Sequence, residues 1–175
     1  DINDNNTLRL TYTGSIERPN LQYISPFVIY SDTKDYTSGN PYLKPVTTNR
    51  VGLDYTFMGN LVVGMYYSVS NNMISQVISM DEDSRLTETK WENARKNKNL
   101  GLNFMYFYNR QKWLNATFMA FGSYVDSKAT TIYTKAHSEY AQATLMMNLN
   151  FVLDSKRIWT SGLNARYSSA EKNCD

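Results

Sequence analysis

Cysteine and histidine are almost missing from this sequence, which has one of each, Cys174 and His137, among 175 residues. A single cysteine excludes an intrachain disulfide and a cysteine-based metal site, and a single histidine excludes a site built from several imidazoles. His137 is expected to be a solvated residue in a loop. The chain also lacks a phosphate-binding glycine loop, a G-x-S-x-G elbow and an H-E-x-x-H pair. We therefore expect no enzymatic activity, no cofactor and no metal site.

A strong charge of one sign and a long apolar run are also missing. The net charge is +2, from 18 basic and 16 acidic residues, so no strong field favours nucleic acid as a partner. No window approaches the roughly 18 consecutive apolar residues of a transmembrane helix. The acidic run at 81–83 lacks the glycine and the alternating oxygen ligands of a calcium loop. We interpret it as a charged loop.

Alternation of apolar and polar residues is what the sequence has in abundance. Seven segments show a period of two, which indicates β-strands: 7–16, 50–57, 61–70, 100–108, 114–124, 141–153 and 159–167. The predicted fold class is all-β, an antiparallel meander of about seven long strands. One face is expected to carry the apolar set Leu8, Leu53, Val63, Leu102, Phe118, Leu145 and Leu163.

Long and short connections alternate along this meander. The long ones are 17–45, 81–98 and 126–138, and the short ones are 58–60, 109–112 and 154–157. Such strands, with short turns at one end and long loops at the other, are typical of a transmembrane β-barrel. The polar face suits a wet lumen, with Arg9, Arg50, Asp54, Asn103, Asn115, Gln142, Asn148, Asn150, Asn164 and Arg166. Aromatic residues near strand ends suit interfacial girdles: Tyr12, Tyr55, Tyr108, Trp113, Tyr124, Trp159 and Tyr167.

A soluble β-sandwich has the same periodicity. In that alternative the Leu and Phe face is the core and the Asn and Thr face meets solvent. The exposed tyrosines and tryptophans would then serve a binding module, for example as stacking platforms for carbohydrate. Periodicity by itself does not distinguish the two.

The first long connection carries a more specific pattern, consisting of Arg18-Pro19, Ile24-Ser25-Pro26-Phe27 and Gly39-Asn40-Pro41-Tyr42-Leu43-Lys44-Pro45. Asn72-Met73-Ile74 and Trp91-Glu92-Asn93 follow it. With these residues the chain resembles the barrel segment of TonB-dependent outer-membrane receptors, especially the outer-membrane β-barrel proteins of the Bacteroidetes type. The resemblance covers essentially the whole chain.

The resemblance implies a protein of the bacterial outer membrane whose external loops bind a nutrient ligand that is then imported through a plugged lumen. The implied partners are outer-membrane lipid, the energy-coupling protein TonB, an unknown small ligand, and the plug and remaining strands of the parent chain. Receptors of this kind resemble 22-stranded barrels with an N-terminal plug. Residues 1–175 are therefore expected to be a single barrel segment, an internal fragment without the plug and the other strands.

The motif residues are expected to be structural: Arg18, Pro19, Gly39, Asn40, Pro41, Leu43, Lys44 and Pro45. The prolines fix φ and remove backbone donors, and Gly39 can take a positive φ where the loop bends back. Val46 stands where an acidic residue often follows the second proline of the family motif. Ligand contacts are expected from loop aromatics, which give a large contact area at low entropic cost: Tyr23, Tyr30, Tyr36, Tyr42, Trp91 and Tyr133.

Overall fold

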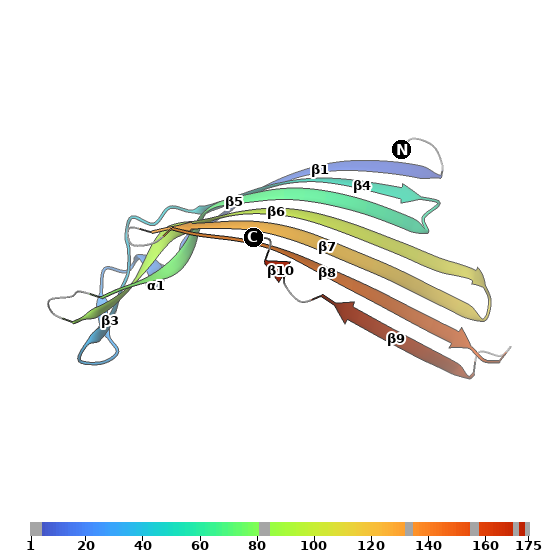
Figure 1. Cartoon of the computed structure of the whole chain (residues 1–175). Helices are drawn as coiled ribbons and strands as arrows, with labels where there is room; N and C mark the ends of the chain where they lie inside the picture. Colours follow the sequence, from blue (N-terminus) through green and yellow to red (C-terminus); the bar gives the residue numbers. More distant parts are fainter. Residues whose placement is uncertain (1–4, 81–84, 132–134, 155–157, 170–171, 174–175) are drawn as a thin grey trace.

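The computed structural model describes residues 5–80, 85–131, 135–154, 158–169 and 172–173. Within them, seven long strands follow one another in chain order across one antiparallel sheet (Figure 1). They are β1 (Asn6–Glu17), β4 (Val46–Phe57), β5 (Leu61–Met80), β6 (Thr87–Gln111), β7 (Leu114–Thr130), β8 (Lys135–Val152) and β9 (Thr160–Ser168). A short strand, β10 (Lys172–Asn173), also pairs with β8. The predicted all-β meander is confirmed.

The register of the sheet fixes which residues share a face, because directly opposed residues of neighbouring strands point to the same side. The apolar pairs Leu10–Leu53, Val63–Phe104 and Leu145–Tyr167 connect strands from one edge of the sheet to the other. All seven predicted apolar residues lie on the face that these pairs define, which we call the apolar face. The ten residues predicted to line a lumen lie on the opposite, polar face.

The sheet is a single layer. Among the residues described, the buried apolar side chains are Leu43, Ala94 and Ala116, whereas Leu102 and Leu145 of the apolar face are 57% and 52% exposed. A soluble sandwich would cover this face with a second sheet. The sandwich alternative is therefore wrong for the part of the chain that the structure describes. No helix in this part is long and apolar enough to cross a bilayer.

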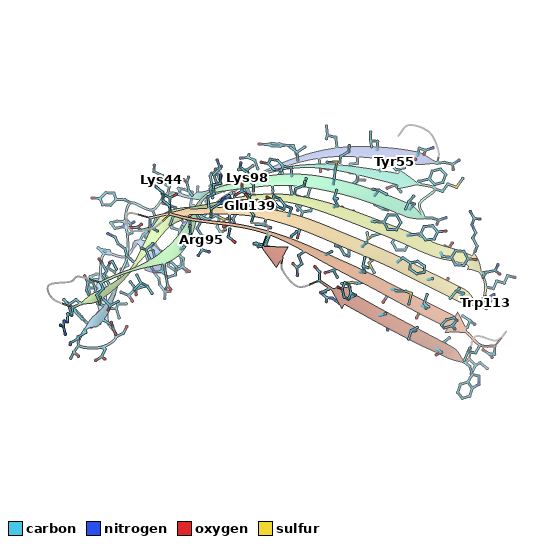
Figure 2. The ribbon with its side chains drawn as sticks, viewed as in Figure 1. Lys44, Tyr55, Arg95, Lys98, Trp113 and Glu139 are labelled. Carbon is cyan, nitrogen blue, oxygen red and sulfur yellow. The ribbon has the colours of Figure 1, made fainter. Side chains whose placement is uncertain are left out.

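Tight turns join the strands at one end of the sheet, which we call the turn end. Between β4 and β5, the Asn60 N–H donates to the Phe57 carbonyl at 3.0 Å. The two central residues, Met58 and Gly59, have φ values of 50° and 67°. Two left-handed central residues are the signature of a type I′ turn, whose twist matches that of a hairpin. Tyr55 and Trp113 lie at this end of the sheet (Figure 2).

At the opposite end, the loop end, four strands are longer than the alternation predicts. β5 has 20 residues and β6 has 25, although a strand needs only about 9–11 to cross a bilayer. Most of the predicted loops 81–98 and 126–138 is therefore strand, and His137 belongs to β8 rather than to a loop. In β6, β7 and β8 the period of two disappears there because both faces of the extensions are mostly polar, while cross-strand pairing still holds the backbone.

The connection between β1 and β4 contains α1 (Leu21–Ile24), β2 (Val28–Tyr30) and β3 (Asp35–Ser38). β2 and β3 form a hairpin, and β3 pairs in parallel with β6 from Thr87 to Lys90. β7 pairs with β6 only from Arg95 onward. β3 therefore occupies the edge of β6 that β7 leaves open, beside the tips of β5 and β6 (Figure 1). Covering an edge in this way prevents it from pairing with another chain.

Candidate functional site at the loop end

Asn93 of β6 fastens the end of the first long connection to the sheet. Its Oδ1 accepts a hydrogen bond from the Lys44 backbone N–H at 2.7 Å, and its Nδ2 donates to the Lys44 carbonyl at 2.9 Å. Nδ2 also donates to the carbonyl of Asn72 at 2.7 Å. Asn72 has a φ of 58° and lies where the register between β5 and β6 shifts. One amide side chain thus joins three segments that the sequence pattern named separately.

Asn40 makes a second attachment a few residues earlier. Its Nδ2 donates to the Trp91 carbonyl at 3.0 Å, and its backbone N–H donates to the Tyr23 carbonyl at 2.6 Å. Its Oδ1 accepts from the Tyr42 N–H at 3.0 Å, which closes a local turn. Leu43 follows as a buried side chain, 9% exposed. These contacts fix the backbone of the connection at this point, and a structural role for Asn40, Leu43 and Lys44 stays a prediction.

Gly39 is needed for a reason other than the one expected. A glycine can take a positive φ here, but the φ of Gly39 is not in the left-handed region. Instead the backbone of Ser25 passes directly beside it, and a Cβ on Gly39 would overlap the Ser25 carbonyl oxygen. The residue is a glycine because two backbone segments approach each other there.

A groove of about 570 Å³ lies at the base of this connection. The ring of Tyr23 from α1 stacks on that of Trp91 from β6, with centroids 3.9 Å apart and planes 27° from parallel. The groove has the size of a small-molecule site, and it combines apolar walls with a few charged groups. Its lining residues are Glu17, Arg18, Pro19, Asn20, Tyr23, Val46, Met73, Ile74 and Trp91.

The aromatic residues predicted to contact a ligand lie at separate places in the structure. Tyr23 and Trp91 meet at the groove, although Trp91 belongs to a strand and not to a loop. Tyr30 and Tyr36 pair across the β2–β3 hairpin, with centroids 5.7 Å apart. Tyr42 is 88% exposed and is not among the lining residues of the groove. Tyr133 lies outside the described residues. A role in ligand contact stays a prediction for all of them.

Sequence reasoning missed an aromatic contact on the polar face. The Arg50 guanidinium carbon lies 3.7 Å from the centroid of the Tyr66 ring, in cation–π geometry. The same ring covers Gly101 on β6 so closely that a Cβ there would overlap it. A glycine inside a strand often marks such a close approach. Gly101, inside a predicted strand, was therefore the feature of the sequence that could have indicated this contact.

A charged cluster on β6, β7 and β8 was also missed. Lys98 and Asp126 form an ion pair, with Nζ 3.7 Å from Oδ2, and His137 Nε2 lies 2.9 Å from Asp126 Oδ1. Desolvation raises the pKa of Asp126, but the hydrogen bond with His137 and the charges of Lys128 and Lys98 outweigh it. The pKa of Asp126 is therefore below its usual value. His137 is not simply solvated, which corrects the expectation from sequence.

A single sheet with one exposed apolar face and one polar face is the wall of a membrane β-barrel. Tyr55 at the turn end, and Tyr124 and Tyr167 farther along the strands, lie on this apolar face, and the ring of Trp113 stacks on that of Phe151. The chain matches the Outer membrane protein beta-barrel family over residues 1–175 and belongs to it. It is accordingly a protein of the bacterial outer membrane. No curated protein gives a significant match.

Proposed function

We propose that this chain forms part of the wall and the external loops of a TonB-dependent receptor, which binds a nutrient ligand and imports it. The observation that carries the proposal is the attachment of the first long connection to β6 through Asn40 and Asn93. Fixing a loop in place removes much of the entropy that a flexible loop would lose on binding. The groove beside Tyr23 and Trp91 is then a preorganised site.

In this proposal each part of the chain has a distinct role. Tyr23 and Trp91 offer ring faces to the ligand, and Arg18 and Glu17 supply charge among the lining residues of the groove. The apolar face contacts outer-membrane lipid, and the polar face lines a lumen that the plug of the parent protein occupies. TonB acts through that plug. Import requires no covalent chemistry from this chain, so we propose neither an enzymatic activity nor a cofactor.

The test uses the complete protein purified in detergent. We would measure its binding to the periplasmic domain of TonB, and to a ferric siderophore, an oligosaccharide and a peptide. Uptake of any compound that binds would then be followed in cells with and without an uncoupler. Binding to TonB together with uncoupler-sensitive uptake is the expected result. A protein that does not bind TonB, or uptake that persists with the uncoupler, would contradict the proposal.

The role of the groove needs matched variants. Trp91→Ala is expected to raise the Kd of the bound compound by about tenfold or more, since aromatic anchors often contribute more than about 1.4 kcal/mol. Phe27→Ala removes an aromatic side chain of the same connection that is 77% exposed and is not among the lining residues of the groove, and it serves as the control. Heat-modifiable mobility on gels would verify that both variants assemble. Equal Kd values for the two variants would show that the groove is not the binding site.

A further inference from the structure

The charged cluster described above has a defined place on the sheet. Asp126 and Glu139 are directly opposed across β7 and β8, and His137 is opposed to Lys128 two pairs farther toward the loop end. All of them continue the apolar face, beyond Tyr124, where the apolar band of β7 ends. The 11 residues from Leu114 to Tyr124 are about what a strand needs to cross a bilayer. The cluster therefore lies outside the lipid-spanning part of these strands.

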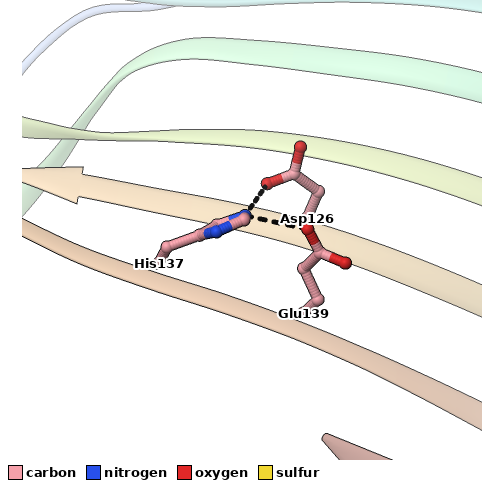
Figure 3. A group of neighbouring side chains, drawn as sticks. All are labelled: Asp126, His137 and Glu139. Atoms are coloured by element: carbon pink, nitrogen blue, oxygen red, sulfur yellow. Dashed lines mark hydrogen bonds and ion pairs between the residues drawn. The ribbon is translucent and has the colours of Figure 1, made fainter. Parts of the chain in front are cut away.

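Three potential ligand atoms converge within this cluster (Figure 3). His137 Nε2 lies 2.9 Å from Asp126 Oδ1 and 3.0 Å from Glu139 Oε1. All three atoms lie within 4.8 Å of one another. We propose that Asp126, His137 and Glu139 bind a divalent transition-metal ion of the Zn²⁺ type. Zn²⁺ accepts one imidazole nitrogen and two carboxylate oxygens at about 2.0–2.2 Å, and its fourth position can hold water.

The second oxygen of each carboxylate supports this assignment. Asp126 Oδ2 faces the Lys98 ammonium at 3.7 Å, and Glu139 Oε2 accepts a hydrogen bond from the Tyr124 hydroxyl. Each carboxylate is thus oriented by a neighbour through one oxygen and offers the other to the common centre. Metal ligands are commonly oriented by such outer contacts, and losing one contact typically weakens metal binding by about 10–100-fold.

The exposure of the three side chains gives a path for the ion. Asp126 is 15% exposed and Glu139 is 30% exposed, so both are held by their surroundings, whereas His137 is 49% exposed. An ion can approach from the His137 side while the carboxylates stay in place. The positive charges of Lys98 and Lys128 repel a cation bound at this site, so we expect the affinity of the site for the metal ion to be moderate. Ca²⁺ is disfavoured because it requires six to eight oxygen ligands.

Without the ion, His137 Nε2 lies within hydrogen-bonding distance of both carboxylates, which is also the geometry of an ordinary ion pair. A metal ion would take this position at Nε2, since metal binds an imidazole nitrogen that carries no proton. A metal site and an ordinary ion pair predict different results in a metal titration, because an ordinary ion pair binds no Zn²⁺.

The experiment is isothermal titration of Zn²⁺ into the complete protein, in detergent and after treatment with a chelator. We expect the wild type to bind one equivalent more than His137→Ala. Glu139→Gln removes one ligand but keeps the side-chain shape, and it is expected to weaken that site at least about tenfold. Tyr124→Phe removes only the outer hydroxyl and is expected to cause a smaller loss. Ca²⁺ should show no difference between wild type and variants.

Asp154→Asn is the matched control, because it removes a carboxylate at the turn end that accepts backbone hydrogen bonds from Ile158 and Trp159. It should leave the Zn²⁺ titration unchanged. Substituting Cu²⁺ and recording its paramagnetic resonance gives a second readout, in which hyperfine coupling to one imidazole nitrogen is expected. Equal Zn²⁺ stoichiometry and Kd in wild type, His137→Ala and Glu139→Gln would overturn the proposal. Loss of binding in His137→Ala alone would also overturn it, because the carboxylate would then not be a ligand.

Discussion

Asn93 hydrogen-bonds both backbone groups of Lys44, accepting from its N–H at 2.7 Å and donating to its carbonyl at 2.9 Å. In this way the side-chain amide of Asn93 pairs with the backbone of Lys44 as the peptide groups of a neighbouring β-strand would. The residues are 49 positions apart, so the contact sets where the first long connection meets β6. Asn72 completes it by accepting from the same Nδ2.

The first prediction removes this attachment. Asn93→Ala deletes three hydrogen bonds, each worth about 0.5–1.5 kcal/mol, and leaves the strands paired. We expect residues 18–45 to become sensitive to limited proteolysis, measured by mass spectrometry, while heat-modifiable mobility stays that of an assembled barrel. Asn109→Ala, at the exposed turn end of the same strand, is the control. Equal cleavage in the two variants would mean that Asn93 does not hold the loop.

The second prediction concerns Gly39. A Cβ at this position overlaps the backbone of Ser25, which cannot move away as a flexible side chain would. We expect Gly39→Ala to shift the loop and to weaken ligand capture, and Gly39→Val to reduce the yield of assembled protein as well. Gly14→Ala is the matched control, since its Cβ would meet neighbours only at 3.6 Å or more. A Gly39→Ala protein indistinguishable from Gly14→Ala in capture and proteolysis would contradict this explanation.

The extent to which the fold follows from the sequence depends on what surrounds each strand. Between the turn end and the level of Tyr124, one face of the sheet is apolar and the other is mostly polar, so alternation is strong and the predicted strands are confirmed. Beyond that, from Thr87 to Lys90 for example, β6 is polar on both faces and is held by pairing with β5 and β3. Pairing of this kind leaves no periodic signal, so most of the extensions of β6, β7 and β8 lie in segments predicted as loops.

The residues of the site that lie within a sequence motif could be predicted. The contacts that depend on how the strands pair could not. Asn40 and Asn93 stood within segments that the sequence pattern had already selected. The stack of Tyr23 on Trp91 depends on where α1 lies, which no local pattern encodes. Asp126, His137 and Glu139 meet only because β7 and β8 pair through the region predicted as a loop.

The third prediction concerns the behaviour of residues 1–175 expressed by themselves. The apolar face is open to solvent, with Leu10 73% exposed and Leu163 52% exposed. Within the described residues, β1 pairs with β4 alone and so leaves an unpaired edge. Exposed apolar surface and open edges both promote association. Sedimentation velocity should show large aggregates without detergent and a discrete species with it. A monomer that stays soluble without detergent would contradict this prediction.

The fourth prediction tests the contact between Tyr66 and Gly101. Gly101→Ala places a Cβ inside the Tyr66 ring, and overpacking of this kind costs about 1–3 kcal/mol. In a Tyr66→Ala background the ring is absent, so the same Gly101→Ala change should have little effect on the free energy of unfolding. Contacting residues show this kind of non-additivity, whereas independent ones do not. The measurement is denaturant unfolding of the complete protein in detergent for the wild type, both single variants and the double variant.

Gly122→Ala is the control, because its Cβ would have nothing within 4 Å, and it should change stability by less than about 0.5 kcal/mol. If Gly101→Ala were equally destabilising with and without Tyr66, the cause would be the backbone of β6 and not the ring.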